Sequence, residues 1–312
     1  MTIYHVLKRL FHLVPVLLVV SAVTFGLIYL APGDPAVMAL RAAGMEPDAE
    51  AVEQIRHDLG LDDPVLVQYF RWLWRTLHGD LGRSIRTGKE VSGELLGRFP
   101  ATMALALAAL AIAMLLSFPL GVLAAVRKGS VMDHASRVMS LAGASIPGFF
   151  LGILLIQIFA VKLKVLPVMG YGGWRHLVLP AITLGLGMAA VYTRMLRAGV
   201  LEILGEDFIR VARAKGLSEA RVVGKHTIRN AILPTMTLVG TGFGYLLGGA
   251  VIVETIFVWP GVGKLAVDAI FNRDYPVVQG YALLMTLVFV LVNMAVDIAY
   301  TVVDPRVRVA AE

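Results

Sequence analysis

The sequence predicts an all-α integral membrane protein with six transmembrane helices and a small helical insertion after the first. Of the 312 residues, 58% are apolar and only 16% are charged, and the mean hydropathy is +0.77. A soluble domain is typically about 45–50% apolar and about 25% charged. Because this excess of apolar side chains is too large for one water-soluble core, we expect lipid to solvate much of the surface.

The number of helices follows from the apolar stretches that are long enough to cross a bilayer. A hydrocarbon core about 30 Å thick needs about 20 residues of α-helix. The stretches are Phe11–Ala31, Ala101–Val126, Arg137–Val161, Leu177–Leu196, Pro234–Val258 and Val277–Val303. Pro147 and Pro180 interrupt the third and fourth stretches. A spanning helix tolerates proline where neighbouring helices or water satisfy the freed carbonyls.

The first stretch, within residues 1–31, is expected to stay as a membrane anchor. Its apolar run exceeds the usual run of about 7–15 residues in a signal peptide. Pro32 directly follows Ala31, which makes a poor cleavage site. We therefore do not expect cleavage here.

Charge sets the expected orientation. With the N-terminus inside, the inner segments 1–9, 126–138, 194–233 and 304–312 hold 15 lysines and arginines against 7 acidic residues. The outer segment 32–100 holds 8 basic and 11 acidic residues, although two shorter outer loops add five basic residues. The positive-inside rule therefore places both termini in the cytoplasm. It also accounts for the net charge of +6 without nucleic acid as a partner.

Residues 32–100 are expected to be folded. Asp63 is placed to cap a helix that starts at Pro64, where the missing N–H costs nothing, and Gly79 suits its C-terminal stop. One apolar face then follows at helical spacing: Leu66, Phe70, Leu73, Trp74 and Leu77. Two interpretations stay open. In one, the helix guides a ligand or docks a partner. In the other, it lies on the membrane surface with its tryptophans, Trp72 included, at the interface, and the two interpretations are compatible.

The inner segment between the fourth and fifth stretches carries the most informative pattern. Its predicted apolar face consists of Phe208, Val211 and Ala212, and its flanking cations are Arg210, Arg213 and Lys215. Gly216 is expected to end this helix and Ser218 to cap the next one. Such a helix suits a groove in a partner protein. A solvated amphipathic connector is the alternative.

This segment resembles the cytoplasmic loop of ABC-importer permeases, in the branch that handles dipeptides, oligopeptides and nickel. That branch carries Ala-Arg-Ala-Lys-Gly-Leu and Arg-Asn-Ala-x-Leu-Pro, which match Ala212–Leu217 and Arg229–Pro234. Arg210, Val211 and Ala212 stand where the wider importer family has Glu-Ala-Ala, a departure typical of this branch. The resemblance covers nearly the whole chain through further motifs at Ala31–Pro35, Leu59–Pro64, Gly79–Ser84, Glu254, Trp259–Gly263, Arg273–Pro276 and Asp304–Arg306.

The resemblance implies a type I ABC importer transmembrane fold in the bacterial inner membrane. Residues 32–100 would be a periplasmic insertion, 101–303 the transmembrane core with a cytoplasmic coupling loop at 197–233, and 304–312 a cytoplasmic tail. The implied coupling helix, which enters the ATPase cleft, is Ala212, Arg213, Ala214, Lys215, Gly216, Leu217 and Ser218.

The resemblance also implies the partners. A second homologous permease subunit would complete the pathway, and a periplasmic or lipid-anchored binding protein would deliver the solute. Two ABC ATPase subunits would use ATP and Mg²⁺, so this chain would bind no cofactor and would not be an enzyme. As a mechanism we expect alternating access, in which the coupling helix transmits ATP-driven closure to the membrane helices.

Two acidic residues fall within predicted spans. Each costs about 2.5–3.5 kcal/mol at a helix centre on insertion scales, so each is expected to face protein or a water-filled path. Glu254 either lines the solute route or outer gate, or anchors the outer loop through an arginine, which we favour. Asp297 is expected to pair with Arg306 or to reach the interface.

Three glycines, Gly240, Gly244 and Gly248, recur every fourth residue in the fifth stretch. Small residues at this spacing let helices approach closely. Packing is the simpler interpretation. If this stretch lines the pathway, Gly244 and Gly248 would leave room for solute.

The solute is predicted from the outer loop Leu166–His176 and the segment Ile270–Pro276, which resemble nickel-transporting members more than peptide-transporting ones. Met169 and His176 are candidate contacts to a nickel chelate, because imidazole suits nickel. The alternative is that the loop's ring side chains are interfacial anchors. We therefore expect nickel or a nickel chelate, with dipeptides or oligopeptides as the alternative, and assign no metal ligand set.

Enzyme motifs are not evident in the sequence. The chain has no cysteine, which excludes disulfides and a cysteine nucleophile. It also lacks a zinc-hydrolase histidine pair, a Gly-x-Ser-x-Gly elbow and a complete phosphate loop at Gly263-Lys264.

The main alternative to an ABC-importer permease is a secondary transporter driven by an ion gradient. That class usually needs carboxylates near the bilayer midplane and internal repeats, and neither is clear here.

Overall fold

The computed structural model describes residues 3–30, 34, 36–37, 40, 44–58 and 60–303. It describes the backbone alone for residues 3–10, 12, 27–30, 233–234, 236–237, 241, 245, 249, 297 and 299–303. The predicted tail at 304–312 lies outside the described residues, and so do both expected placements of the Asp297 side chain.

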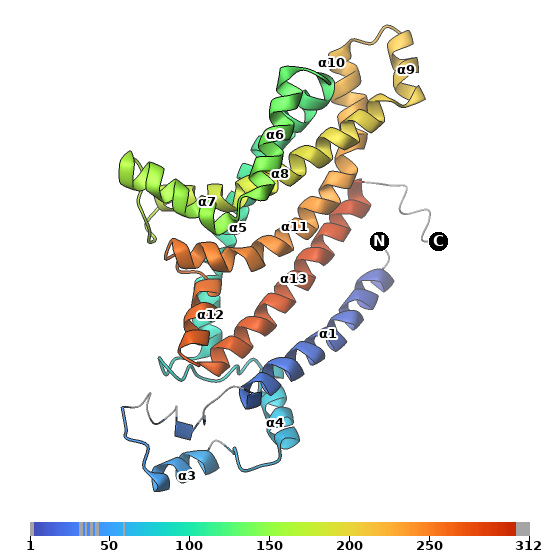
Figure 1. The fold of residues 1–312 in the computed structure, drawn as a ribbon. Helices are drawn as coiled ribbons and strands as arrows, with labels where there is room; N and C mark the ends of the chain where they lie inside the picture. The colour runs from blue at the N-terminus through green and yellow to red at the C-terminus, as the bar shows by residue number, and fades with distance from the viewer. Residues whose placement is uncertain are drawn as a thin grey trace. The chain divides into compact units, whose positions relative to one another are not determined.

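The described residues form helices, as predicted, and one isolated bridge between Arg83 and Glu90 (Figure 1). Two of the helices, η1 and η2, are π-helical. In chain order they are α1 (Ile3–Leu30), α3 (Ala49–Asp58), α4 (Val65–Leu77), α5 (Val91–Val126), α6 (Val131–Ser145), α7 (Gly148–Leu155), η1 (Ile156–Lys162), α8 (Trp174–Leu204), α9 (Asp207–Ala214), α10 (Glu219–Arg221), η2 (Val222–Thr227), α11 (Ile228–Ile256), α12 (Val262–Phe271) and α13 (Tyr275–Val303).

The chain divides into two compact units. Unit 1 comprises residues 1–6, 101–260 and 291–312, and unit 2 comprises 7–100 and 261–290. The predicted coupling loop at 197–233 belongs to unit 1, and so does the loop from which the solute was predicted, Leu166–His176, which we call the solute loop. The predicted outer insertion at 32–100 belongs to unit 2.

Among the described residues, three helices are long and apolar enough to cross a bilayer: α5, α8 and the part Tyr275–Val296 of α13. Two bent pairs raise the number to five if each counts as one span. One pair is α6 with the helix from Gly148 to Lys162, and the other lies within α11, where Leu238–Gly248 and Ala250–Ile256 meet at 43°. The described apolar part of α1, Leu13–Gly26, is shorter. Up to five of the six predicted spans are thus supported by length and composition.

The predicted third span, Arg137–Val161, is not one continuous helix. α6 and α7 meet at 102°, the sharp corner visible in Figure 1. Pro147 explains the break, because a proline disfavours helical backbone in the residue before it. Ile146 is accordingly extended, with ψ 122°. Pro180, in contrast, lies inside α8 without ending it.

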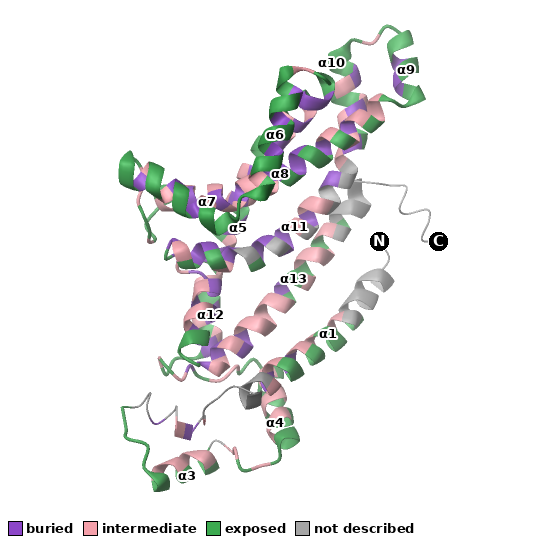
Figure 2. Ribbon diagram, in the orientation of Figure 1, coloured by how far each residue is buried: buried purple, intermediate pink, exposed green. Residues whose placement is uncertain are grey.

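The core of unit 1 forms where α5, α7, α8 and α11 pack together, and its buried residues include Leu105, Leu155, Leu179, Val253 and Phe257. A Cβ added at Gly185 of α8 would lie 2.8 Å from the carbonyl oxygen of Ala109 in α5. The absence of that atom lets the two backbones approach closely. In Figure 2, buried residues recur along α8 and α11, whereas α7 is largely exposed.

In unit 2, α4 packs against α1 through aromatic side chains. Tyr69 and Trp72 lie 5.4 and 5.6 Å from Phe25, measured between ring centroids. The Tyr69 hydroxyl also shares a hydrogen bond of 2.9 Å with Ser21. The predicted apolar face of α4 is turned the other way, and four of its residues are exposed: Leu66, Phe70, Trp74 and Leu77.

The start of α4 differs from the prediction. Pro64 occupies the N-cap position, and no side chain caps the helix. Asp63 pairs with Arg71 at 2.6 Å instead, because a guanidinium offers a carboxylate a stronger, charge-assisted hydrogen bond than a backbone N–H does. At the other end Gly79 has φ +85° and follows the C-cap residue, which confirms the predicted stop.

Asp274 joins two of the sequence motifs within unit 2. Its carboxylate accepts hydrogen bonds from the Ser84 hydroxyl and, at 3.0 Å, from the backbone N–H of Ile85. Asp274 and Ser84 are both buried. The motifs Gly79–Ser84 and Arg273–Pro276 are therefore structural partners.

Candidate functional site

The connection between α8 and α11 in unit 1 is the first candidate site, because it holds the helix expected to meet a partner. The turn between α9 and α10 is made by Gly216, whose φ is +78°. Glycine adopts this left-handed conformation without the steric penalty of a Cβ. Gly216 thus follows the end of α9, as predicted.

The α9 helix has a buried and an exposed face, and the prediction divided them wrongly. Ile209 and Ala212 are buried against Val222 of η2. Phe208 and Val211 are 44% and 53% exposed. Residues i and i+3 share a helix face, so this helix offers two apolar pairs, and only the packing against η2 decides which pair turns inward. Ala212 belongs to the inner pair.

The segment predicted as the coupling helix, Ala212–Ser218, is helical only in part. Only Ala212, Arg213 and Ala214 are helical; Lys215 is the C-cap, and Gly216 and Leu217 belong to the turn. The positive φ of Gly216 ends the helix, so the helical element precedes the motif glycine. Ser218 occupies the N-cap position of α10, as predicted, although its hydroxyl makes no capping bond.

An ion pair closes the turn between α9 and α10. The Arg213 guanidinium donates to both carboxylate oxygens of Glu219, at 2.7 and 3.2 Å. These hydrogen bonds hold the pKa of Glu219 below its ordinary value and raise the pKa of Arg213. Both side chains are largely exposed, so the pair adds little to global stability. Its effect is local, since it holds α9 and α10 together across Gly216.

A second ion pair joins α6 to α8, and sequence analysis missed it. Arg197 donates from Nε and Nη2 to the two carboxylate oxygens of Asp133, at 2.6 and 2.9 Å. Asp133 is buried and also accepts from the backbone N–H of Gly129 at 3.0 Å. The two partners are 64 residues apart, so no local spacing pointed to them.

Glu254 is fully buried near the end of α11. Its carboxylate accepts a hydrogen bond from the hydroxyl of Thr102 in α5. The expected arginine partner stays a prediction. The backbone carbonyl of Glu254 accepts from the N–H of Trp259 at 2.8 Å. These contacts support the structural interpretation of Glu254, because within unit 1 the carboxylate is enclosed.

The loop that contains Met169, predicted to be an outer loop, lies against this same end of α11. The Gly170 N–H donates to the Phe257 carbonyl at 2.8 Å, and the Tyr171 ring meets Trp259 edge-on with centroids 4.8 Å apart. The structure therefore brings together the solute loop and the Glu254 segment, which the sequence had presented as separate motifs.

The two candidate metal contacts differ in exposure, and only Met169 lies in that loop, because His176 belongs to the first turn of α8. Met169 is exposed, whereas His176 is partly buried, with Nδ1 3.1 Å from the Gly172 carbonyl oxygen. Within the described part of the chain, no group of three or more His, Asp or Glu side chains is arranged to hold a metal ion.

The three ridge glycines of α11 have different surroundings. A Cβ at Gly240 would lie 2.1 Å from Cγ1 of Val296 in α13, so this glycine permits close helix packing. Gly244 is buried. At Gly248, which is exposed, a Cβ would meet nothing within 4 Å. Close packing against α13 explains the glycine at 240, whereas the space beside Gly248 is open.

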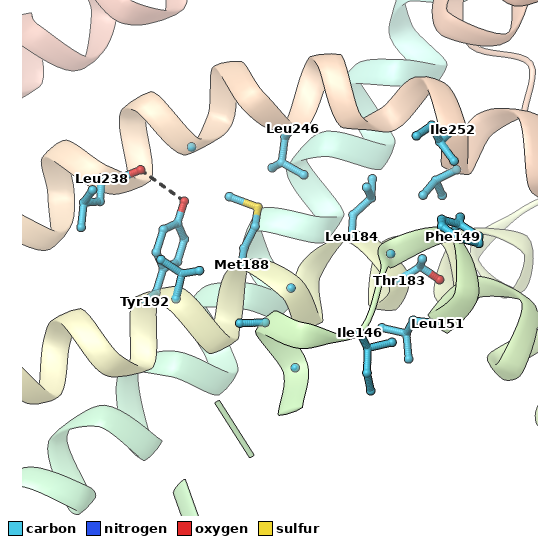
Figure 3. Close-up of a pocket in the computed structure, with 17 residues that line it drawn as sticks. Ile146, Phe149, Leu151, Thr183, Leu184, Met188, Tyr192, Leu238, Leu246 and Ile252 are labelled. Carbon is cyan, nitrogen blue, oxygen red and sulfur yellow. Dashed lines mark hydrogen bonds between the residues drawn. The ribbon is translucent and has the colours of Figure 1, made fainter. Parts of the chain in front are cut away.

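A cavity of about 580 Å³ is lined by the end of α6, by α7, by α8 and by α11. Most of its lining is apolar, including Ile146, Phe149, Leu184, Met188, Leu246 and Ile252 (Figure 3). Its two hydroxyl groups are already engaged. Thr183 donates to the Leu179 carbonyl at 2.8 Å and Tyr192 to the Leu238 carbonyl at 3.4 Å, the latter drawn as a dashed line in Figure 3. The cavity suits an apolar occupant.

Comparison with known families decides the class of protein. Residues 117–309 match the family "Binding-protein-dependent transport system inner membrane component", and residues 2–106 match the N-terminal part of such membrane components. The chain belongs to this family.

This permease is similar to proteins that carry the name "Glutathione transport system permease protein GsiC". The one from Escherichia coli strain K12 is 42% identical over 304 residues, which cover 97% of this chain and 98% of that protein. The one from Salmonella paratyphi A is 43% identical with the same coverage.

Solved structures share the fold of this permease. A chain of the MetNI methionine ABC transporter in an inward-facing conformation superposes with a TM-score of 0.59 at 20% identity, covering 68% of this chain and 96% of that chain. A chain of an amino acid ABC transporter gives 0.52 at 16% identity, covering 69% and 94%. The predicted type I ABC importer fold is confirmed.

Family membership establishes the coarse role. The chain is the permease subunit of a bacterial ABC importer in the inner membrane, and it works with a second permease subunit, ABC ATPases and a substrate-binding protein. The partner ATPases hydrolyse ATP, so the permease is not an enzyme.

Proposed function

We propose that this permease forms half of the pathway for a short peptide-like solute of the glutathione class. The observation that carries the proposal is similarity at 42–43% identity over nearly the full length to permeases named for glutathione transport. Nickel or a nickel chelate is the second candidate, because Met169 lies in the loop that contacts the end of α11 and His176 follows that loop in the first turn of α8.

The solute is tested by ATP turnover of the reconstituted importer with its binding protein. Glutathione and dipeptides are compared with a nickel–histidine chelate. We expect stimulation by the peptide-like solutes, and we expect the double variant M169A/H176A to retain it. Stimulation by the nickel chelate alone, lost in that variant, would favour nickel.

The ATPases act, we propose, on α9, with Phe208 and Val211 as its docking face. An exposed apolar pair on a short helix suits a groove in a partner. The buried pair Ile209 and Ala212 then carries movement of α9 into η2, because the two elements share one apolar cluster. This is the proposed path from nucleotide-driven closure to alternating access.

We further propose that both termini and the segment 197–233 are cytoplasmic and that 32–100 is periplasmic. The distribution of basic residues supports this orientation. Because the chain contains no cysteine, single variants K215C and R75C can be labelled with a membrane-impermeant maleimide in intact cells. We expect labelling of R75C only. Labelling of K215C would overturn the orientation.

Solute uptake by membrane vesicles distinguishes an ATP-driven importer from a transporter driven by an ion gradient. Vesicles with internal ATP and no ion gradient are expected to transport, since the partner ATPases supply the energy. Transport that needs only a gradient would contradict the ATP-driven role.

A further inference from the structure

Three arginines line one small cavity between α6 and α8 in unit 1. The cavity has a volume of about 260 Å³ and is bounded by Arg137, Leu141, Arg194 and Arg197. Arg197 is paired with Asp133. Arg137 and Arg194 are exposed, and neither donates a hydrogen bond or forms an ion pair within the described part of the chain. The cavity is therefore lined by three guanidinium groups, and only that of Arg197 is paired with a carboxylate, that of Asp133.

The apolar cavity of about 580 Å³ is lined in part by the same two helices, α6 and α8. On α8, Val191 and Gly187 precede Arg194 by three and seven residues and so share its helix face. On α6, Ala144 follows Leu141 by three residues. Ala144, Val191 and Gly187 all line the larger cavity. The cationic cavity and the apolar cavity are therefore lined by residues about one helical turn apart on α6 and α8, and we call the two together the groove.

Two contacts hold the walls of this groove together. The Asp133–Arg197 pair joins α6 to α8 beside the cationic part. A Cβ added at Gly143 of α6 would lie 3.2 Å from the Cβ of Ala190 in α8, so the helices are close there as well. The groove is therefore a built feature of unit 1.

An occupant must combine a negative group with a hydrocarbon chain. A free phosphate would use the arginines and leave the apolar cavity unfilled, whereas a neutral apolar molecule would leave the arginines unpaired. The larger cavity is within the range of about 300–1,000 Å³ typical of ligand pockets. Basic pockets between transmembrane helices bind the head groups of anionic lipids, and a membrane permease always has such lipids beside it.

We propose that this groove binds one anionic phospholipid. Its phosphate contacts Arg137 and Arg194, and one acyl chain enters the apolar cavity past Val191 and Gly187. The bound lipid would lie in the leaflet beside the α8–α9 connection. This inference rests on the family's membrane location and not on the proposed solute.

The cationic part is tested by native mass spectrometry of the complete importer complex, with phosphatidylglycerol and phosphatidylethanolamine of equal chain length in competition. We expect one phosphatidylglycerol to be retained on the permease. Each near-surface arginine contributes about fivefold to the binding of an anionic lipid, so R137Q/R194Q should lose about 25-fold of the preference. The matched variant R127Q/K128Q removes two nearby basic residues outside the cavity and should keep it.

The apolar part is tested by G187L. Gly187 lines the cavity, and a Cβ there meets nothing within 4 Å, so we expect a leucine to occupy part of the cavity. Displacing two buried methylenes costs about tenfold in affinity. Long-chain phosphatidylglycerol should therefore bind about tenfold more weakly, dihexanoyl phosphatidylglycerol should be unaffected, and G97L in α5 should behave as wild type.

Three results would overturn the proposal. One is an unchanged lipid preference in R137Q/R194Q, and another is undiminished long-chain binding in G187L. The third is displacement of the lipid by inorganic phosphate or by glutathione at equal concentration, which would indicate an anion site or a solute site instead.

Discussion

The indole N–H of Trp259 donates to the backbone carbonyl of Ala101 at 2.9 Å, although 158 residues separate the two in sequence. The hydroxyl of the next residue, Thr102, donates to the buried carboxylate of Glu254. Two successive residues of α5 thereby hold the end of α11 and the turn that follows it. Glu254 and Trp259, which entered the sequence analysis as separate motifs, form one structural tie.

Removing the indole donor tests this tie. W259F should lower the stability of the detergent-solubilised permease by about 0.5–2 kcal/mol, the range for hydrogen bonds between helices in membranes and in proteins generally. Thermal unfolding followed by circular dichroism measures it. The control W174F changes a tryptophan that is 73% exposed and should leave stability unchanged. Equal stability of both variants would mean that the hydrogen bond contributes nothing.

The outer face of α9 is tested by F208S/V211S. Burying an apolar side chain contributes about 1.5–3 kcal/mol, so losing two should weaken ATPase binding by about 100-fold or more. Permease stability should be unchanged, because both side chains are exposed. I209A should instead destabilise the loop, since Ile209 is fully buried. Binding of the ATPases is measured by co-purification and titration. Unaffected binding to F208S/V211S would remove α9 from the interface.

Gly216 and Gly224 form a matched pair for the loop turn. A Cβ at either position meets nothing within 4 Å, but only Gly216 has a positive φ. G216A should therefore cost about 1–2 kcal/mol through backbone strain alone, whereas G224A should be neutral or slightly stabilising. Limited proteolysis at the α9–α10 turn reports the difference. Equal cleavage of the two variants would show that the turn tolerates a side chain.

The ridge of α11 gives a second glycine comparison. G240A places a methyl group against Val296 and should cost about 1–3 kcal/mol by overpacking. G248A has open space and should be tolerated in unfolding experiments. Transport assays on the stable G248A variant then ask whether that space serves the solute. A stable G240A variant would contradict the close packing of α11 on α13.

The Arg213–Glu219 pair predicts a pH dependence of the loop. The pKa of Glu219 is lowered in the folded loop by the Arg213 hydrogen bond, so the stabilisation is fully present above the unfolded value of about 4.3. It is lost as the pH falls through the lowered folded value. A fluorophore on A214C should therefore gain mobility on acidification below about pH 4. The charge-neutral variant E219Q should show that mobility at every pH. An identical acid response in E219Q would assign the change to another group.

Local features were the ones that sequence analysis predicted well. The apolar stretches predicted the spans because the length of a helix must match the thickness of the bilayer. Gly216 and Gly79 were recognised as helix stops because glycine adopts a positive φ without steric cost, and this tolerance depends on the residue type alone. Pro147 was noted as an interruption, but whether it bends or breaks a helix depends on the neighbours, and Pro180 in α8 shows the other outcome.

Errors arose where the sequence offered a residue two alternative sets of partners. Asp63 had a backbone N–H and the Arg71 guanidinium within reach, and it pairs with the guanidinium. On α9, the sequence analysis grouped Ala212 with Phe208 and Val211, whereas packing against Val222 buries Ala212 together with Ile209. The pair Asp133–Arg197 had no local signature at all.

The sequence by itself determined that this chain is helical, that it is embedded in lipid and that it resembles the importer permeases. The length of an apolar stretch and a linear motif are both local properties of the chain. Only the tertiary structure decided which side of α9 is exposed, that the buried carboxylate of Glu254 accepts a hydrogen bond from Thr102, and that Arg137 and Arg194 share a cavity. Those outcomes depend on contacts between residues distant in the chain. Burial and the pairing of charges are set by which helices meet, and a linear pattern contains no such information.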